Sequence, residues 1–201
     1  MAAGAFVAPN MAFYILNTYV VAYGTSATGL HLPRSTMLAA NLLASAPMPA
    51  VMVLAGAFSD RYGRRRIFMT GVALMGIWAF ILFPLIERRS LLWITVAILV
   101  GACLTTLTYG PMAAMFAELF NTSVRYSAAS LAYQIGAIVG GGLAPVIATG
   151  LYARYHSNIW VSVYIAGACA VSLVCVSILK ETRETRLEEP TQPTVTAVVN
   201  T

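Results

Sequence analysis

Long apolar runs, separated by short charged clusters, make up most of the chain. Six runs carry no Lys, Arg, Asp or Glu, and they cover residues 1–33, 35–59, 67–86, 90–117, 126–153 and 155–179. Each run is long enough for a helix that crosses the hydrocarbon core, which takes about 20 residues. The runs lack the two-residue alternation of barrel strands, and only helices and closed barrels satisfy the backbone in lipid. The pattern therefore predicts an all-α integral membrane protein with transmembrane helices at about residues 5–25, 36–57, 67–86, 91–117, 127–152 and 158–179.

The composition places the chain in a lipid bilayer. Of its 201 residues, 59% are hydrophobic and 9% are charged, whereas a soluble domain carries about 25% charged residues. The net charge of +5 comes from basic clusters between the apolar runs, a placement that suits anionic lipids better than a nucleic-acid partner. Cys103, Cys169 and Cys175 lie inside apolar runs and lack the spacing of metal ligands or of a disulfide framework.

The basic residues also predict an orientation. If the loop around residues 60–66 is cytoplasmic and the chain then alternates, eight of the 12 Lys and Arg residues fall on the cytoplasmic side. This bias follows the positive-inside rule and puts both termini in the cytoplasm. The polar segment 181–201, which contains Pro190 and Pro193, is predicted to be a disordered cytoplasmic tail.

The loop after the second run carries the most specific motif, G-x-x-x-D-R-x-G-R-R. Its residues are Gly56, Asp60, Arg61, Gly63, Arg64 and Arg65. Gly56 is expected to let two helix ends approach, and Gly63 to permit a tight turn. Asp60 can accept charge-assisted hydrogen bonds from an arginine or a helix N-terminus. We interpret the motif as a cytoplasmic gate that stabilises one conformation of a carrier. The alternative is that Arg61 to Arg66 are only a positive-inside topology signal.

A second motif follows the fourth run. Residues 118–125 read E-L-F-N-T-S-V-R and are similar to E-[IL]-F-P-T-x-V-R, with Asn121 in place of the usual proline. Glu118 and Arg125 are expected partners of the Asp60 loop. The alternative is that Glu118 and Arg125 are only two solvated charges at helix ends.

These motifs resemble the major facilitator superfamily, and the stretches 129–134 and 141–145 resemble its metabolite:proton symporter family. The resemblance aligns the chain with helices seven to twelve of a twelve-helix carrier. It implies that residues 1–180 form one half of a facilitator fold, a 3+3 inverted repeat. Members of that family move shikimate, dicarboxylates, citrate, proline or betaines with protons. The resemblance thus implies a secondary active transporter in a bacterial inner membrane, driven by the proton gradient and without a cofactor.

Polar residues within the apolar runs are the candidates for a substrate cavity, because polar groups in lipid are costly unless they face a cavity or another helix. They are Asn10, Tyr14 and Asn17 in the first run, Thr105, Thr108 and Tyr109 in the fourth, and Ser130, Tyr133 and Gln134 in the fifth. Hydrogen bonding between helices, without substrate contact, is the open alternative for each group. The third and sixth runs are poor in polar residues, as expected of helices that face lipid.

The expected partners of this half follow from its lack of a carboxylate within the apolar runs. No carboxylate lies deep in an apolar run, so the proton-coupling group is expected in a missing N-terminal six-helix half or a second copy. A metabolite and a proton would bind between the halves. The alternative is a non-transporting membrane subunit or an inactive truncated fragment. A membrane enzyme is not expected, because paired aspartates, a zinc-type histidine pair and a Ser-His dyad at membrane depth are not evident.

Overall fold

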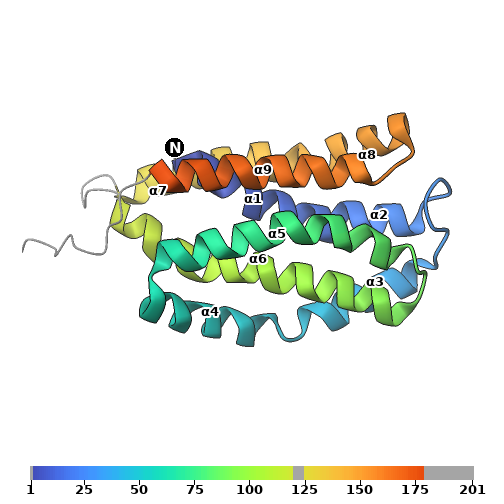
Figure 1. Cartoon of the computed structure of the whole chain (residues 1–201), viewed down its shortest axis with the longest axis horizontal. Coiled ribbons are helices and arrows are strands. Elements are labelled where there is room, and N and C mark those ends of the chain that lie inside the picture. The colour runs from blue at the N-terminus through green and yellow to red at the C-terminus, as the bar shows by residue number, and fades with distance from the viewer. Residues whose placement is uncertain (1, 120–124, 179–201) are drawn as a thin grey trace, which may run out of the picture.

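The computed structural model describes residues 2–119 and 125–178, and these residues form a bundle of helices (Figure 1). The elements are α1 (Ala2–Tyr14), the π-helical segment η1 (Ile15–Tyr19), α2 (Val20–Thr25), α3 (Arg34–Ser45), α4 (Met48–Tyr62), α5 (Arg64–Ile86), α6 (Leu91–Leu119), α7 (Arg125–Gly136), the π-helical segment η2 (Ala137–Gly142), α8 (Ala144–Tyr155) and α9 (Ile159–Ile178).

Six stretches of the described residues are helical, long and apolar enough to cross a membrane. They are Ala3–Thr25, Arg34–Tyr62, Arg64–Ile86, Leu91–Met112, Ser127–Tyr155 and Ile159–Ile178, called here the first to sixth spans. The first span is α1, η1 and α2, the second is α3 and α4, and the fifth is α7, η2 and α8. The prediction of an all-α membrane fold with six transmembrane helices is therefore confirmed.

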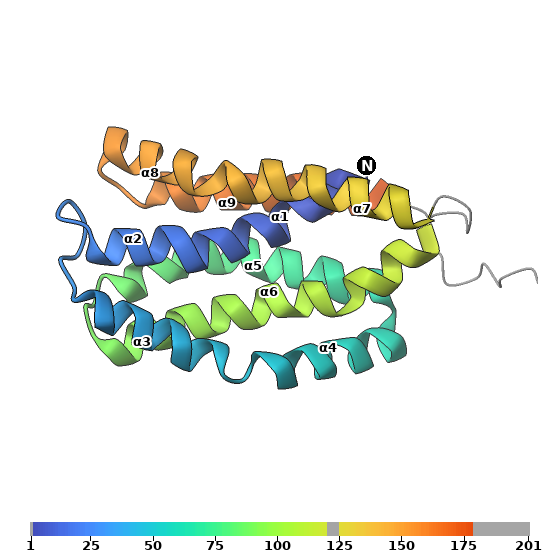
Figure 2. The ribbon, with the colours of Figure 1, turned by 180° about the vertical axis from the view of Figure 1, so that it is seen from behind.

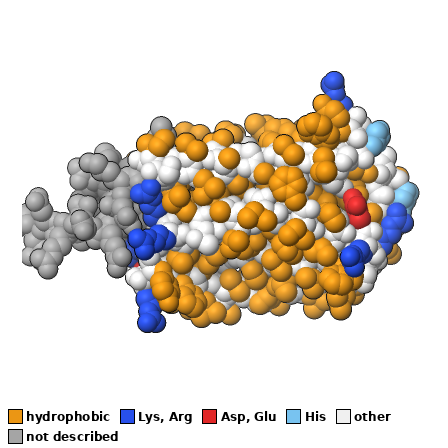
Figure 3. Space-filling model, viewed as in Figure 1, with side chains coloured by type: hydrophobic (Ala, Val, Ile, Leu, Met, Phe, Trp, Pro, Cys, Tyr) orange, Lys and Arg blue, Asp and Glu red, His pale blue; other side chains and the backbone are white. Residues whose placement is uncertain are grey.

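The spans lie side by side, and their connections gather at two opposite ends of the bundle (Figures 1 and 2). One end holds the turn at Gly63, the N-terminus and the end of α9, and we call it the Gly63 end. The other holds residues 26–33, 87–90 and 156–158, and we call it the Glu87 end. A broad band of hydrophobic side chains covers the surface between the two, while basic side chains gather at both ends (Figure 3). This distribution suits a bilayer with a head-group region at each end.

The first span lies at the centre of the bundle. Of its most apolar stretch 61% is buried, against 17% for the second span. Two glycines of the fifth span allow this packing: a Cβ at Gly136 would lie 3.0 Å from the carbonyl oxygen of Ala3, and one at Gly140 would collide with the backbone of Val7. The G-x-x-x-G spacing thus lets the fifth span approach α1 closely.

The sixth span is more polar in its contacts than the sequence pattern indicated. The hydroxyl of Ser172 accepts a hydrogen bond from the amide of Ala8 (3.0 Å) and donates one to the carbonyl oxygen of Gly4 (2.8 Å). Ser172 therefore bridges a backbone donor and a backbone acceptor four residues apart in α1, in the turn that precedes Pro9. Ser162 likewise donates to the carbonyl oxygen of Ala79 on α5 (2.7 Å). Buried serines thus connect the sixth span to the first and third.

Candidate substrate cavity and gating motif

A cavity of about 500 Å³ lies among the first, second, fourth and fifth spans. Its lining residues are Asn10, Phe13, Tyr14, Leu16, Asn17, Asn41, Ser45, Met48, Met52, Ile98, Ala102, Thr105, Thr106, Tyr109 and Tyr133. Phe13 and Met52 are about half exposed, so the cavity opens onto the surface of the bundle. The structure thus brings six of the nine sequence-predicted cavity residues together: Asn10, Tyr14, Asn17, Thr105, Tyr109 and Tyr133.

Asn10 and Tyr109 connect the first and fourth spans beside the cavity. Asn10 is 1% exposed, and its amide nitrogen donates to the carbonyl oxygen of Phe6 (2.9 Å). The hydroxyl of Tyr109 donates to Oδ1 of Asn10 (3.2 Å). Both hydrogen-bonding atoms of the Asn10 side chain are therefore satisfied, as a buried amide requires.

Asn41 in α3 is a cavity residue that the sequence analysis missed. Its Nδ2 donates to Oδ1 of Asn17 (3.2 Å), and Nδ2 of Asn17 donates to the carbonyl oxygen of Phe13 (2.9 Å). The signal was present in the sequence, because an amide side chain in the middle of an apolar run needs a partner or a cavity. The two amides present a polar surface contributed by the first and second spans.

The cavity wall carries no charge among the residues described. Its hydroxyl groups are largely engaged within the bundle: Thr105 donates to the carbonyl oxygen of Gly101 (2.8 Å) and Thr106 to the sulfur of Met48 (3.1 Å). The surface that remains consists mainly of aromatic rings, aliphatic side chains, thioethers and amides. Such a wall can contact the uncharged parts of a small metabolite, whereas an ionic partner for a charged group would have to come from elsewhere.

Three predicted cavity residues do not line it. Thr108 is fully buried, donates to the carbonyl oxygen of Thr105 (2.6 Å) and packs at Gly71 of α5, where an added Cβ would be 2.8 Å from its methyl group. Thr108 therefore belongs to the packing between the third and fourth spans. Ser130 and Gln134 are exposed on a face of α7 outside the cavity lining, whereas Tyr133 points inward and packs edge-on against Phe6 at 5.4 Å.

Both π-helical segments lie next to the cavity. Asn17 is within η1, and in η2 an added Cβ at Gly141 would be 2.6 Å from the ring of Tyr14. π-Helical turns inside α-helices are rare and occur frequently at functional sites. Here they shape the walls that the first and fifth spans contribute.

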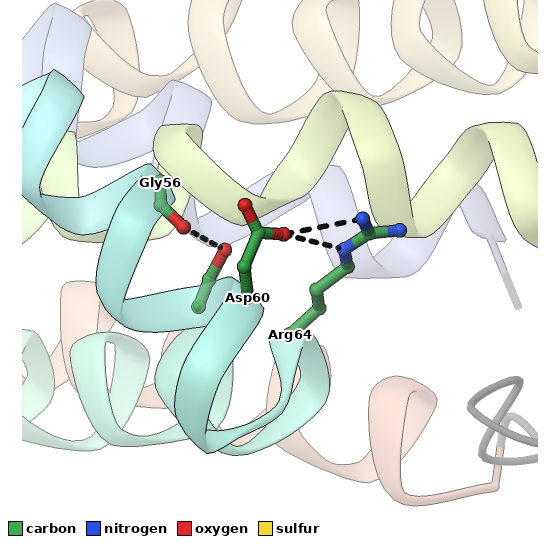
Figure 4. A network of polar contacts seen from close by, with 4 residues as sticks. Gly56, Asp60 and Arg64 are labelled. Atoms are coloured by element: carbon green, nitrogen blue, oxygen red, sulfur yellow. Dashed lines mark hydrogen bonds and ion pairs between the residues drawn. The ribbon is translucent and has the colours of Figure 1, made fainter.

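The predicted gating motif lies at the Gly63 end, where Asp60 and Arg64 face each other (Figure 4). Nη2 and Nε of Arg64 donate to Oδ1 of Asp60 at 3.2 and 3.4 Å. The Asp60 side chain is 66% exposed and that of Arg64 32%. The hydroxyl of Ser59, one turn from Gly63, donates to the carbonyl oxygen of Gly56 (2.7 Å). The acidic group is therefore held by a neighbouring arginine within its own motif and remains accessible.

The glycines of the motif have different roles. Gly63 joins α4 to α5 with φ of 101°, a conformation that only glycine adopts readily. The sequence analysis expected Gly56 to let two helix ends approach. A Cβ on Gly56 would meet nothing within 4 Å, so a side chain there would not hinder the packing of the described helices. Gly110 allows a close approach instead: a Cβ there would be 2.8 Å from Cβ of Ala55.

The remaining basic residues of the motif lie at the surface. Nη2 of Arg65 donates to the carbonyl oxygen of Ser177 (2.6 Å) near the end of α9, where a cation satisfies a free carbonyl and the helix dipole. The Arg61 guanidinium lies 5.9 Å from the ring of Tyr62. The side chains of Glu118 and Arg125, the predicted partners of the Asp60 loop, lie outside the described residues, as does the segment 181–201.

Comparison with known proteins gives the chain its family. The Major Facilitator Superfamily profile matches residues 1–200. The chain is 33% identical to the inner membrane metabolite transport protein YhjE of Escherichia coli, over 87% of this chain and 40% of the relative. It is 30% identical to the E. coli shikimate transporter (86% and 40%) and 28% identical to the E. coli proline/betaine transporter (94% and 37%).

The chain thus spans about 40% of the length of the curated relatives it matches. No solved structure matches it significantly. The match to the superfamily profile covers nearly every residue and agrees with the six spans and with the motif around Asp60. The chain belongs to the Major Facilitator Superfamily.

Proposed function

We propose that the chain forms one six-helix half of a secondary active transporter. The transporter moves a small organic acid, amino acid or betaine-type metabolite together with a proton, by alternating access. One observation carries the proposal: the cavity is lined by polar residues from the first, second, fourth and fifth spans. In facilitator folds the substrate binds between two six-helix halves near the middle of the membrane. The names of the relatives support a metabolite as the substrate.

The neutral cavity wall supports a division of tasks between two halves. Within the described part, neither Asp60 nor Glu87 lines the cavity. A proton-coupled carrier needs a group whose protonation changes as the gates move. We therefore assign the coupling group, and the ionic partner of a charged substrate, to a second six-helix half or a second copy of this chain.

The proposed setting is a bacterial inner membrane with both termini in the cytoplasm. Arg61, Arg64, Arg65 and Arg66 lie at the Gly63 end, as does the N-terminus. A basic cluster in a short loop marks the cytoplasmic side under the positive-inside rule. The gate formed by Asp60 and Arg64 would then open and close toward the cytoplasm.

The test is uptake by a reconstituted carrier. This chain is fused behind the N-terminal six-helix half of a relative, purified and placed in liposomes with an imposed pH gradient. We expect gradient-dependent accumulation of at least one compound from a panel of radiolabelled shikimate, proline and glycine betaine, abolished by a protonophore. Uptake that ignores the pH gradient would contradict proton coupling. A correctly inserted fusion that accumulates none of the panel would favour a non-transporting subunit or an inactive fragment.

A further inference from the structure

Four residues at the Glu87 end form a hydrogen-bond network that connects three spans. The hydroxyl of Tyr19 donates to Oδ1 of Asn158 (2.8 Å). Nδ2 of Asn158 and the hydroxyl of Tyr23 donate to Oε1 of Glu87, at 3.2 and 3.4 Å. Tyr19 and Tyr23 belong to the first span, Glu87 follows the third, and Asn158 precedes the sixth. We call these four residues the Glu87 network.

The carboxylate of Glu87 gives this network its direction. A carboxylate only accepts hydrogen bonds, so it requires the amide nitrogen of Asn158 on its side. Oδ1 of Asn158 then faces Tyr19, which must donate. Such linked bonds polarise one another. Tyr19, Tyr23 and Asn158 are 3%, 6% and 6% exposed, whereas Glu87 is exposed, so the network runs from a surface carboxylate into the buried end of the first span.

The network acts on the π-helical segment η1. Tyr19 is the last residue of η1, and Tyr23 lies four residues further on, on the same face of α2. A π-helical turn holds one residue more than an α-helical turn, and one residue corresponds to about 100° of rotation. If η1 became α-helical, the rings of Tyr19 and Tyr23 would rotate away from Asn158 and Glu87. The network therefore favours the π-helical state of η1.

The same segment contains a cavity residue. Asn17 lies in η1, two residues before Tyr19, and accepts the hydrogen bond from Asn41 across the cavity wall. We propose that Glu87 is a positioning residue: through Asn158, Tyr19 and Tyr23 it holds η1 in its π-helical state and thereby places Asn17 in the cavity. The link to substrate rests on the proposed function, whereas the effect on the first span rests on the geometry alone.

Hydrogen exchange measured by mass spectrometry on the chain in lipid nanodiscs tests the effect on the first span. Glu87→Ala should speed amide exchange in residues 15–25 by about tenfold. The variant lacks the hydrogen bonds to the Glu87 carboxylate that local opening of the wild-type chain has to break, so opening costs less free energy. Peptides from Leu91–Met112 should be unchanged. Tyr23→Phe should give a smaller rise in the same residues, and adding it to Glu87→Ala should give no further rise. Tyr155→Phe, at the same end of the bundle but outside the network, is the matched control.

Two further readouts separate positioning from general stability. Glu87→Gln keeps an acceptor oxygen and should restore part of the protection of residues 15–25. In the fused carrier, Glu87→Ala should raise the KM for substrate several-fold and leave the maximal rate within twofold. Unchanged exchange in residues 15–25, or an equal rise in all spans, would overturn the proposal. A carrier without uptake would contradict the proposed function, while the exchange result would still decide the role of Glu87.

Discussion

The hydroxyl of Tyr109 and Oδ1 of Asn10 lie 3.2 Å apart and join the fourth span to the first beside the cavity. The side-chain amide nitrogen of Asn10 already donates a hydrogen bond to the carbonyl oxygen of Phe6. Because Asn10 is 1% exposed, its oxygen would stay largely shielded from water if Tyr109 lost its hydroxyl. This pair therefore fixes the relative position of two helices that line the cavity.

Replacing Tyr109 by Phe should lower the stability of the chain by about 1 kcal/mol, the order of an interhelical hydrogen bond in a membrane protein. The ring, and hence most of the packing, is retained. Thermal unfolding in detergent, followed by tryptophan fluorescence, measures the change. Tyr155→Phe is the control, since its exposed ring stacks on Trp160 at 4.8 Å and should keep the wild-type Tm. Equal Tm values for both variants would contradict the role of the Asn10 contact.

Gly140→Ala should destabilise the packing of the fifth span on α1. The added methyl group would collide with the backbone of Val7, and backbone cannot move aside as a flexible side chain does. Overpacking of this kind costs about 1–3 kcal/mol. The matched control is Gly142→Ala, two residues further on, where a Cβ meets nothing within 4 Å. The prediction fails if the two alanine variants unfold at the same temperature.

Asp60→Asn should separate transport from stability. The Asp60–Arg64 pair is an exposed i,i+4 contact, and such pairs contribute only about 0.3–0.5 kcal/mol. We therefore expect an almost unchanged Tm of the chain, together with loss of most uptake by the fused carrier, because the charge that holds the gate is gone. Thr70→Ala, on the exposed face of α5, should affect neither. Wild-type uptake by the Asp60→Asn carrier would show that the motif serves topology alone.

Asn41→Ala tests the amide pair that the first and second spans contribute to the cavity. Removing the donor leaves Oδ1 of Asn17 without its contact. A lost hydrogen bond of this type is worth about 1 kcal/mol, so the substrate concentration at half-maximal uptake should rise about five- to tenfold. Gln134 lies outside the cavity lining of this half, so Gln134→Ala should leave the substrate concentration at half-maximal uptake unchanged. The reverse result would place the substrate against α7 rather than α3.

The fold followed from the sequence because charged residues mark the ends of the spans. Arg34, Asp60, Glu87 and Arg154 interrupt runs that are otherwise free of charge, and the cost of a charge in hydrocarbon makes such interruptions reliable boundaries. The π-helical segments η1 and η2 could not be predicted in this way. Their residues meet partners far along the chain, such as Asn158 for Tyr19 in η1, and the local sequence carries no strong signal for one extra residue in a helical turn.

The cavity was predicted in part, and the misses share one cause. Helical spacing indicates which residues share a face, but not which neighbour that face meets. Thr105 and Tyr109 face the cavity, while Thr108 turns enough to reach Gly71. Glu87 lies between two apolar runs in the sequence, yet the first and sixth spans bring Tyr23 and Asn158 to it. Contacts of this range become visible only in the folded bundle.

The second span, least enclosed of the six among the described residues, has a consequence for how the bundle comes apart. A helix that buries little surface against its siblings contributes little to their cooperative unfolding. On heating, the second span, formed by α3 and α4, should therefore detach early and leave a smaller five-helix remnant that melts later. A thermal unfolding curve with two transitions would show this order of unfolding.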